Sequence, residues 1–336
     1  MKFRKIGKKV SPAEVALVLS SGGAKGSYQV GVIKELLNRG TKIDLVIGSS
    51  IGAFNGALLT EFINSGLSYR QICANLEEIW MEVNSFLTFN CRGFLKNVLR
   101  PLKIPSVFSN IGIKKLLNKY IPEERRFHHY TRCQLSVTGT NLDRKDLTIF
   151  DFNSEIPVNQ AVLASMTFPV AFPAVEIAGD HYIDGGALDN APLKEAILWG
   201  ARQIYVVFLT PIALIEGKEE ERDRCKDFSA LGVIEEFIDL ASNRLMYDDL
   251  KKAKKINQLL RILNRYEHGL PAEFLSEIRK LYGLKFGDGK RIIRVINLGP
   301  TQVLDPPGLM GFNRKKLLKE LVIRGQRDAR SLLQKK

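Results

Sequence analysis

Apolar and polar positions in the first part of the chain follow two periods in succession, which predicts alternating strands and helices. Residues 13–20 form a near-continuous apolar run of strand length, and residues 28–37 carry apolar side chains at helical spacing. Residues 43–47 return to a short, β-branched run, after which small residues at helical spacing continue to residue 64. Buried strands that alternate with helices are typical of a parallel sheet with crossover helices.

The rest of the chain continues this α/β succession. Further strands and helices are predicted at residues 135–141, 147–150, 161–165, 192–199, 203–210, 291–298 and 313–333. We expect three regions: a catalytic core over residues 13–212, a charged helical insertion or subdomain over 213–289, and a returning strand with a basic helix over 290–336. Residues 66–112 turn from helical to irregular and apolar, which fits either ordinary core or a mobile cap that lines an acyl-chain tunnel or touches a membrane.

The clearest chemical signal lies between the second predicted strand and the helix after it. There Gly48, Ser50 and Gly52 form a Gly-x-Ser-x-Gly motif. A strand before this motif and a helix after it are the context of a nucleophile elbow, whose tight turn requires small residues and lifts the serine hydroxyl above the strand end. Although the bare motif also arises by chance, this context makes Ser50 a candidate nucleophile.

A glycine-rich loop follows the first predicted strand. Its residues are Gly22, Gly23, Ala24, Lys25 and Gly26. Such a loop could cradle nucleotide phosphates, or its backbone N–H groups could form an oxyanion hole for a tetrahedral intermediate. The order of residues matches neither the dinucleotide fingerprint nor the Walker A motif. Adjacent ends of parallel strands would place the loop beside the candidate nucleophile, which favours the oxyanion hole.

Charge adds a possible binding surface to this picture. The 336 residues are 45% hydrophobic and 26% charged, which is ordinary for a soluble globular protein. The net charge is +14, and residues 1–10 and 314–336 together carry most of it. Basic ends suit an anionic surface such as phospholipid headgroups, and a purely solubilising role is the alternative. We regard nucleic acid as the less favoured partner.

Compartment and cofactors follow from what the sequence contains. No apolar run is long enough to span a bilayer, and no apolar segment of a signal peptide follows the basic start, so we expect a cytoplasmic protein with peripheral membrane contact. The four cysteines are widely spaced and form no C-x-x-C pair, which indicates reduced thiols. We expect no metal and no other cofactor.

A serine hydroxyl needs a base within reach before it can attack an ester. Asp184, followed by Gly185 and Gly186 after a short predicted strand, is the better candidate and would act directly in a Ser–Asp dyad. His268 stands at the polar end of a helix, and His181 lies three residues before the aspartate with nothing in the sequence to orient it.

Taken in order, these motifs resemble the patatin-like phospholipase family over roughly residues 15–210. The shared features are the glycine loop with a basic residue before its last glycine, the Gly-x-Ser-x-Gly elbow, and the Asp-Gly-Gly motif. The run at residues 164–173 resembles the segment between the second and third motifs. Ser21 departs from the pattern, because it stands where the family loop has its first glycine and would be strained if that position required positive φ.

The resemblance implies a serine acyl hydrolase on a three-layer α/β/α fold. It assigns Ser50 as the nucleophile and Asp184 as the general base, with the loop from Gly22 to Gly26 as the oxyanion hole. The leading hypothesis is a phospholipase A or lysophospholipase that forms an acyl-Ser50 intermediate at an anionic membrane surface. The alternatives are an acyltransferase that uses the same acyl-enzyme and a catalytically silent, basic lipid-binding protein.

Overall fold

One mixed sheet runs through the molecule. The computed structural model describes residues 13–83, 106, 108–189, 191–215, 230–266, 293–304 and 311–334, with isolated positions between 269 and 277. Within this part of the chain the sheet has eight strands, in the order β5-β6-β3-β2-β1-β7-β8, and β4 pairs with β3. The strands are β1 Val15–Leu19, β2 Leu45–Gly48, β3 Gln134–Asn141, β4 Asp146–Phe150, β5 Val175–Ile177, β6 Asp180–Asp184, β7 Gln203–Val207 and β8 Arg294–Leu298.

The centre of the sheet is parallel and one side is antiparallel. β1, β2, β3, β7 and β8 run in the same direction, whereas β4 and β6 run antiparallel to β3, and β5 antiparallel to β6. The prediction of a mainly parallel sheet is therefore confirmed. The antiparallel strand β5 was not predicted, because three residues are too few to produce a recognisable pattern.

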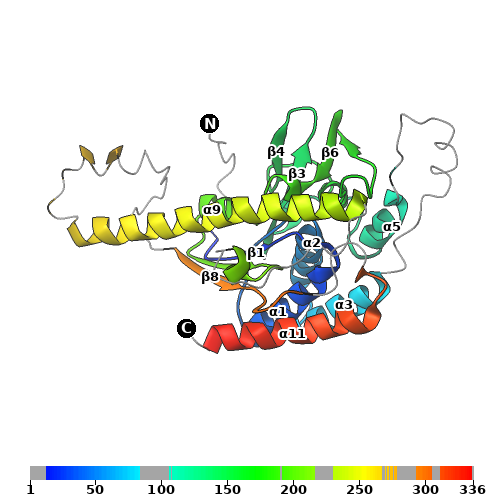
Figure 1. Cartoon of the computed structure of the whole chain (residues 1–336), viewed down its shortest axis with the longest axis horizontal. Helices are drawn as coiled ribbons and strands as arrows, with labels where there is room; N and C mark the ends of the chain where they lie inside the picture. Colours follow the sequence, from blue (N-terminus) through cyan, green and yellow to red (C-terminus); the bar gives the residue numbers. More distant parts are fainter. Residues whose placement is uncertain are drawn as a thin grey trace.

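Helices cover both faces of this sheet. They are α1 Gly26–Asn38, α2 Ile51–Asn64, α3 Tyr69–Glu82, α5 Asn110–Tyr120, α6 Val158–Ser165, α7 Leu193–Leu198, α8 Ile212–Ile215, α9 Ala230–Tyr266 and α11 Lys315–Gln334, with short 3-10 turns η1 Gly23–Lys25, η3 Phe127–His129 and η4 Gly185–Ala187. Figure 1 shows the long helix α9 along one side of the sheet, while α1 and α11 lie on the other side.

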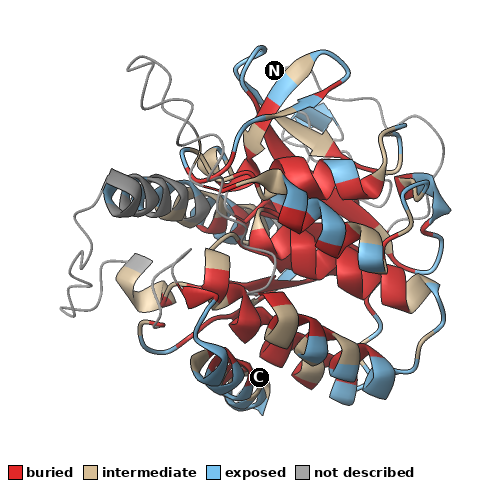
Figure 2. Cartoon of the chain, turned by 90° about the vertical axis from the view of Figure 1, so that its right-hand side faces the viewer, coloured by how far each residue is buried: buried red, intermediate tan, exposed pale blue. Residues whose placement is uncertain are grey.

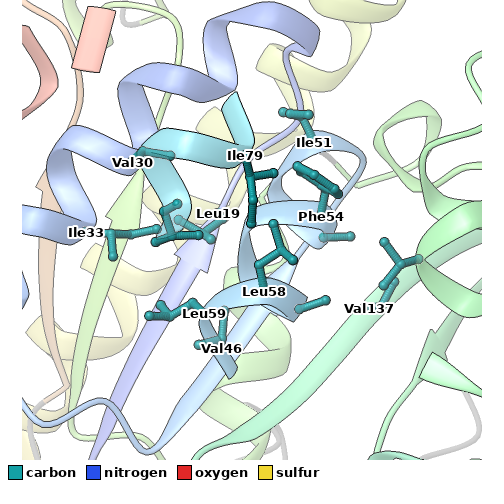
Figure 3. Packing of buried hydrophobic residues seen from close by; sticks show 14 of the residues in the cluster. Leu19, Val30, Ile33, Val46, Ile51, Phe54, Leu58, Leu59, Ile79 and Val137 are labelled. Carbon is teal, nitrogen blue, oxygen red and sulfur yellow. The ribbon is translucent and has the colours of Figure 1, made fainter. Parts of the chain in front are cut away.

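Alternate residues of the central strands face two different cores. On β1, Leu17 and Leu19 pack with α1, α2 and α3, whereas Ala16 and Val18 pack with α7 and α9. Figure 3 shows the first of these cores from close by, including Leu19. In Figure 2 the buried residues run through the sheet and the helix faces turned towards it. Because a strand places successive side chains on opposite faces, two cores on one sheet make the three-layer α/β/α fold that the family resemblance implied.

The C-terminal helix α11 packs directly along α1. A Cβ built on Gly31 would lie 2.0 Å from the carbonyl oxygen of Val322, and one built on Gly325 would lie 2.1 Å from the carbonyl oxygen of Tyr28. The two helices thus approach each other backbone to backbone. Since α1 begins directly after the glycine loop, α11 supports the element that carries the loop.

Several expectations are not settled by this part of the chain. The basic segment at residues 1–10, His268, and residues 84–105 and 107 of the segment proposed as a cap lie outside the described residues. The division into regions at residues 212 and 289 stays a prediction. Among the residues that the structure describes, no helix has both the length and the apolar composition needed to cross a membrane.

Candidate active site

The turn between β2 and α2 places Ser50 in an unusual backbone conformation. Ser50 has φ 54 and ψ −123, a region that residues with a side chain rarely adopt. A Cβ on Gly48 would lie 2.3 Å from the carbonyl oxygen of Gly52, and one on Gly52 would lie 2.3 Å from that of Leu19. Both glycines are therefore required by close backbone contacts, and the predicted elbow is present in its expected strand-turn-helix context.

Asp184 reaches the same level of the sheet from the antiparallel side. Gly48 pairs with Val137 of β3, and Asp184 pairs with Gly139, two residues further along the same strand. Because Ser50 lies two residues beyond Gly48, the two side chains meet across β3. The Ser50 hydroxyl donates a hydrogen bond to Oδ2 of Asp184.

The carboxylate of Asp184 is held in place from several directions. Its Oδ1 accepts a hydrogen bond of 2.7 Å from the backbone N–H of Gly186, so Oδ2 is the oxygen that faces the serine. The backbone of Asp184 is fixed as well, because its N–H donates to the Thr167 carbonyl at 2.9 Å and its carbonyl accepts from Thr140 Oγ1 at 2.8 Å. With 3% of its surface exposed, this carboxylate is almost fully buried.

The Asp-Gly-Gly loop packs closely against its surroundings. A Cβ on Gly185 would lie 2.2 Å from Thr138 Oγ1, and a Cβ on Gly186 would lie 2.2 Å from Ser21 Oγ. The second contact brings this loop against the glycine loop that follows β1. All three sequence motifs therefore meet at one edge of the sheet.

The glycine loop lies beside the candidate nucleophile. A Cβ on Gly26 would lie 2.4 Å from the side chain of Ile51, the residue directly after Ser50. Gly22 and Gly23 adopt φ 144 and 54, so the positive φ values of the loop fall on glycines and not on Ser21. The strain that serine would have met at positive φ does not arise. Ala24 is buried and Lys25 half-buried within η1, and an oxyanion role for this loop stays a prediction.

A buried polar network that sequence reasoning missed braces both ends of the glycine loop. Gln29 Nε2 donates to the Ser20 carbonyl at 2.7 Å, and Asn55 Nδ2 donates to the Gly26 carbonyl at 2.9 Å and to Gln29 Oε1 at 2.8 Å. Trp80 Nε1 completes the network with a hydrogen bond of 2.9 Å to Asn55 Oδ1. The available signal was polar residues among the apolar positions of two helices, which does not reveal their partners.

The backbone of Ser50 is also tied to α6. The N–H of Ser50 donates a hydrogen bond of 2.9 Å to the hydroxyl of Ser165, the last residue of that helix. Sequence reasoning placed this serine in the segment between the second and third motifs, but assigned it no contact. The bond links the elbow to the segment that precedes β5 and β6.

His181 does not take part in this arrangement. It lies three residues before Asp184 on β6, so its side chain leaves the strand on the opposite face. Its ring is exposed, and Nδ1 lies 3.1 Å from Oδ2 of Asp143 in the turn between β3 and β4. Asp184, and not His181, is therefore the group that lies against the Ser50 hydroxyl.

A second aspartate near the site has an altered acidity. The pKa of Asp189 is raised to about 7, mainly by burial and also by the nearby carboxylates of Asp249 on α9 and Glu195 on α7, while a backbone hydrogen bond from Ala191 and the charge of Lys194 oppose the change. Asp189 lies at the end of the loop that begins with Asp184. Two carboxylates thus lie close together where α9 meets this loop.

We expect this aspartate to make the stability of the protein depend on pH. Because the pKa of Asp189 in the native state, about 7, lies above its ordinary value of 3.8, the native state keeps a proton that the unfolded chain loses. The stabilising contribution is full below about pH 4 and is lost as the pH rises towards 7. Asp189→Asn is expected to raise the free energy of unfolding at pH 8 by on the order of 2 kcal/mol, with allowance for partial solvent screening, and to change it little at pH 4.

Denaturant unfolding of both proteins at the two pH values measures this difference. Asp249→Asn provides the matched control, because removing the second carboxylate should raise stability at pH 8 only while Asp189 is present. An equal effect of Asp189→Asn at both pH values would contradict the expected titration.

Together, the fold and the site define a class of protein: an α/β protein with a serine on a nucleophile elbow, hydrogen-bonded to an aspartate from a neighbouring strand. The family model described as Patatin-like phospholipase matches residues 17–197, a segment that contains both Ser50 and Asp184. The chain belongs to the patatin-like phospholipase family.

Curated relatives agree with this family but are much longer proteins. The chain is 26% identical over 208 residues to Lysophospholipase NTE1 of Lodderomyces elongisporus, which covers 61% of the chain and 13% of the relative. It is 27% identical over 224 residues to Patatin-like phospholipase domain-containing protein 7 of Rattus norvegicus, which covers 66% of the chain and 15% of the relative. The chain therefore corresponds to only a small part of these relatives.

Among solved structures, the crystal structure of VipD from Legionella pneumophila aligns with 96% of this chain and 67% of its own. The sequence identity is 16% and the TM-score is 0.43. A likeness at this level does not by itself establish a shared fold, so the fold rests on the sheet order and on the family match.

Proposed function

We propose that the protein is a lipid acyl hydrolase of the phospholipase A or lysophospholipase type. The observation that carries this proposal is the hydrogen bond from the Ser50 hydroxyl to the buried Asp184 carboxylate. Membership of the patatin-like phospholipase family supports a lipid ester as the substrate. Relatives named lysophospholipase favour substrates with a single acyl chain among the candidates.

In the proposed mechanism, Asp184 acts as the general base. Its Oδ2 takes the hydroxyl proton while Oγ of Ser50 attacks the ester carbonyl carbon, which gives a tetrahedral intermediate with a negatively charged oxygen. Backbone N–H groups of the glycine loop would stabilise that oxygen. Collapse of the intermediate breaks the bond to the alcohol, which leaves with the proton held by Asp184, and an acyl-Ser50 ester remains.

The second half of the reaction repeats these steps with water. Asp184 takes a proton from a water molecule, which attacks the acyl-Ser50 carbonyl, and the fatty acid leaves as Ser50 recovers its proton. The fixed carboxylate suits both halves, because the hydrogen bond from Gly186 to Oδ1 keeps Oδ2 directed at the reacting oxygen. The strained backbone of Ser50 supports the same role, since it presents the hydroxyl at the start of α2.

We further propose that the protein acts at an anionic membrane surface. The net charge of +14 supports attraction to acidic phospholipid. The substrate would then be reached from the lipid surface and not from solution.

Product analysis tests the proposed activity. Wild-type protein is incubated with phosphatidylcholine, with lysophosphatidylcholine and with a soluble short-chain ester, and free fatty acid is measured together with the released alcohol. We expect equal amounts of both products, and covalent labelling of Ser50 by a fluorophosphonate that mass spectrometry locates. Acyl groups found on an added alcohol instead of free fatty acid would identify an acyltransferase. Absence of both turnover and labelling would favour a lipid-binding protein.

A further inference from the structure

Helix α9 runs from the edge of the sheet formed by the C-terminal ends of the parallel strands, where Ser50 lies, to the edge formed by their N-terminal ends. Near its N-terminal part, Asn243 Nδ2 lies 3.5 Å from Oγ1 of Thr210, which follows β7 at the edge where Ser50 lies. Further along, Asn257 Nδ2 donates to the Ile293 carbonyl at 2.6 Å, directly before the start of β8. Because β7 and β8 are parallel, these two contacts lie at opposite edges.

The first part of α9, residues 230–242, therefore extends past the edge of the sheet that carries the site. Thirteen helical residues span about 20 Å. The middle of the helix is held by its own core, because Leu250 and Ala253 are buried against Leu193 and Ala196 of α7. α9 also contacts η4, the turn that begins directly after Asp184. The helix is thus anchored to the core in its middle and projects next to the site.

The outer face of α9 is apolar where the helix projects. Val233, Phe237 and Leu240 are 48%, 69% and 63% exposed. Their spacings of four and three residues place them on one side of the helix. Single exposed apolar side chains are common, but three large ones in a row on a projecting helix form a surface that water does not favour.

The same face becomes basic along the middle of the helix. Continuing at spacings of four, seven and four residues from Leu240, it presents the exposed side chains of Arg244, Lys251 and Lys255. Arg244 lies 3.9 Å from Asp248, a weak surface pair. The sequence of the projecting part also contains three acidic residues, Glu235, Glu236 and Asp239. Attraction to a negative surface must therefore come from the middle of the helix, and apolar contact from its projecting part.

Exposed apolar side chains also stand next to the site on other elements. Leu188 is exposed at the end of η4, and its N–H donates to the Gly185 carbonyl within the Asp-Gly-Gly loop. Val170 is exposed in the turn after α6, three residues beyond Thr167, whose carbonyl accepts the N–H of Asp184. In the described structure, the exposed apolar side chains of α9 are therefore accompanied by Leu188 and Val170 at the same edge of the sheet.

We propose that the outer face of α9 docks on an anionic phospholipid membrane and so holds the protein at the surface that carries its substrate. Val233, Phe237 and Leu240 enter the boundary between headgroups and acyl chains, while Arg244, Lys251 and Lys255 lie over the phosphates. A helix with one apolar and basic face that lies in the plane of the interface binds in this way. This inference rests on the proposed function, because it supplies the surface from which a lipid substrate would be taken.

Helix α11 offers a matched surface on the opposite side of the sheet. Its Ile323 is 68% exposed, almost the same as Phe237, and Lys316 and Lys319 are exposed on the same helix. Within the described part of α11, however, Ile323 is the one large exposed apolar side chain. If α9 is the docking surface, substitutions on α9 should weaken membrane binding, whereas the corresponding substitutions on α11 should not change it.

Vesicle flotation tests the proposal on the full chain. The variants are Phe237→Ser with Leu240→Ser for apolar contact, Lys251→Glu with Lys255→Glu for charge, and Ile323→Ser and Lys316→Glu with Lys319→Glu as controls. On vesicles of phosphatidylcholine with phosphatidylglycerol, we expect each α9 pair to reduce the partition coefficient by about tenfold or more. The charge pair should have little effect on vesicles of phosphatidylcholine alone, and the two α11 controls should bind as wild type.

Hydrolysis separates docking from chemistry. The α9 variants should lose activity towards lipid in anionic vesicles but keep wild-type activity towards a soluble short-chain ester, because the changed side chains are exposed on α9 and take no part in the hydrogen bonds described above for Ser50 and Asp184. A different result would refute the proposed function but support the docking surface: the wild-type protein binds vesicles, the α9 variants bind them less, and none of these proteins hydrolyses an ester.

Three results would overturn the docking proposal. The first is unchanged vesicle binding in both α9 pairs. The second is an equal loss in the Ile323→Ser control, which would indicate unspecific apolar binding. The third is dimerisation in the absence of lipid that rises with concentration and disappears in Phe237→Ser with Leu240→Ser, since a second copy of the chain would then be the occupant of this face.

Discussion

Replacing Ser50 by alanine or Asp184 by asparagine is expected to reduce ester hydrolysis by about 10⁴-fold or more, because nucleophile and base act as one unit. Asparagine has nearly the shape of aspartate but cannot accept the serine proton. Both variants should fold, because two hydrogen bonds can persist. The backbone N–H of residue 50 can still donate to the Ser165 hydroxyl, and the backbone N–H of Gly186 can still donate to the side chain of residue 184. Initial rates on a soluble ester and circular dichroism measure the two effects.

The neighbouring Ser49 provides the matched control. It belongs to the same turn and is fully buried, but the hydrogen bond to Asp184 comes from Ser50. Ser49→Ala should therefore keep most of the activity. The double variant of Ser50 and Asp184 should be no slower than either single variant, as is expected for residues of one catalytic unit. Substantial activity in Asp184→Asn would mean that another group serves as the base.

Replacing Gly31 or Gly325 by alanine is expected to destabilise the protein by about 3 kcal/mol or more, because the new methyl group would meet backbone atoms of the opposite helix. The nearest atoms lie 2.0 Å and 2.1 Å from the two Cβ positions. Backbone cannot move aside as a flexible side chain can, so α1 and α11 must separate. Helix propensity alone predicts the opposite sign, a gain of about 1 kcal/mol for each change from glycine to alanine.

Denaturant unfolding decides between these signs. Gly269→Ala is a suitable control, since nothing lies within 4 Å of its Cβ position and its φ is not positive. Separation of the helices would also disturb the hydrogen bond of 3.3 Å from the Tyr28 hydroxyl to Asp328, and with it the start of α1 beside the glycine loop. We therefore expect ester hydrolysis to fall together with stability. A variant at residue 325 that is as stable as wild type would show that α11 can shift without cost.

Much of the fold follows from local pattern in the sequence. The strands at residues 135–141 and 147–150 were predicted within one residue of β3 and β4, because a polar turn between two β-branched runs is a strong local signal. The predicted basic helix at residues 313–333 likewise agrees with α11. The charged insertion at residues 213–289 was predicted as helical, but its sequence did not reveal one helix of 37 residues that projects beside the site.

The candidate site divides in the same way. The elbow around Ser50 could be predicted, because its two glycines are required by close contacts with backbone a few residues away and with the adjoining strand. The Asp-Gly-Gly motif was recognisable, but the sequence between it and the elbow does not predict how the two motifs lie relative to each other in space. The network of Gln29, Asn55 and Trp80 was missed, because a buried polar side chain is specified by partners that lie far away in the sequence.

The sequence by itself determined the parallel α/β core, the nucleophile elbow and the glycine loop, because each depends on backbone conformation and periodicity over a few neighbouring residues. The tertiary structure decided which base meets the serine: the antiparallel β6 aligns Asp184 with Gly139 and sends His181 to the other face. It also decided that α11 braces α1 and that α9 exposes an apolar and basic face beside the site. These features depend on contacts between segments that are distant in the sequence, from 33 residues between Asn243 and Thr210 to 300 residues between Tyr28 and Asp328, and no local pattern encodes the free energy of such contacts.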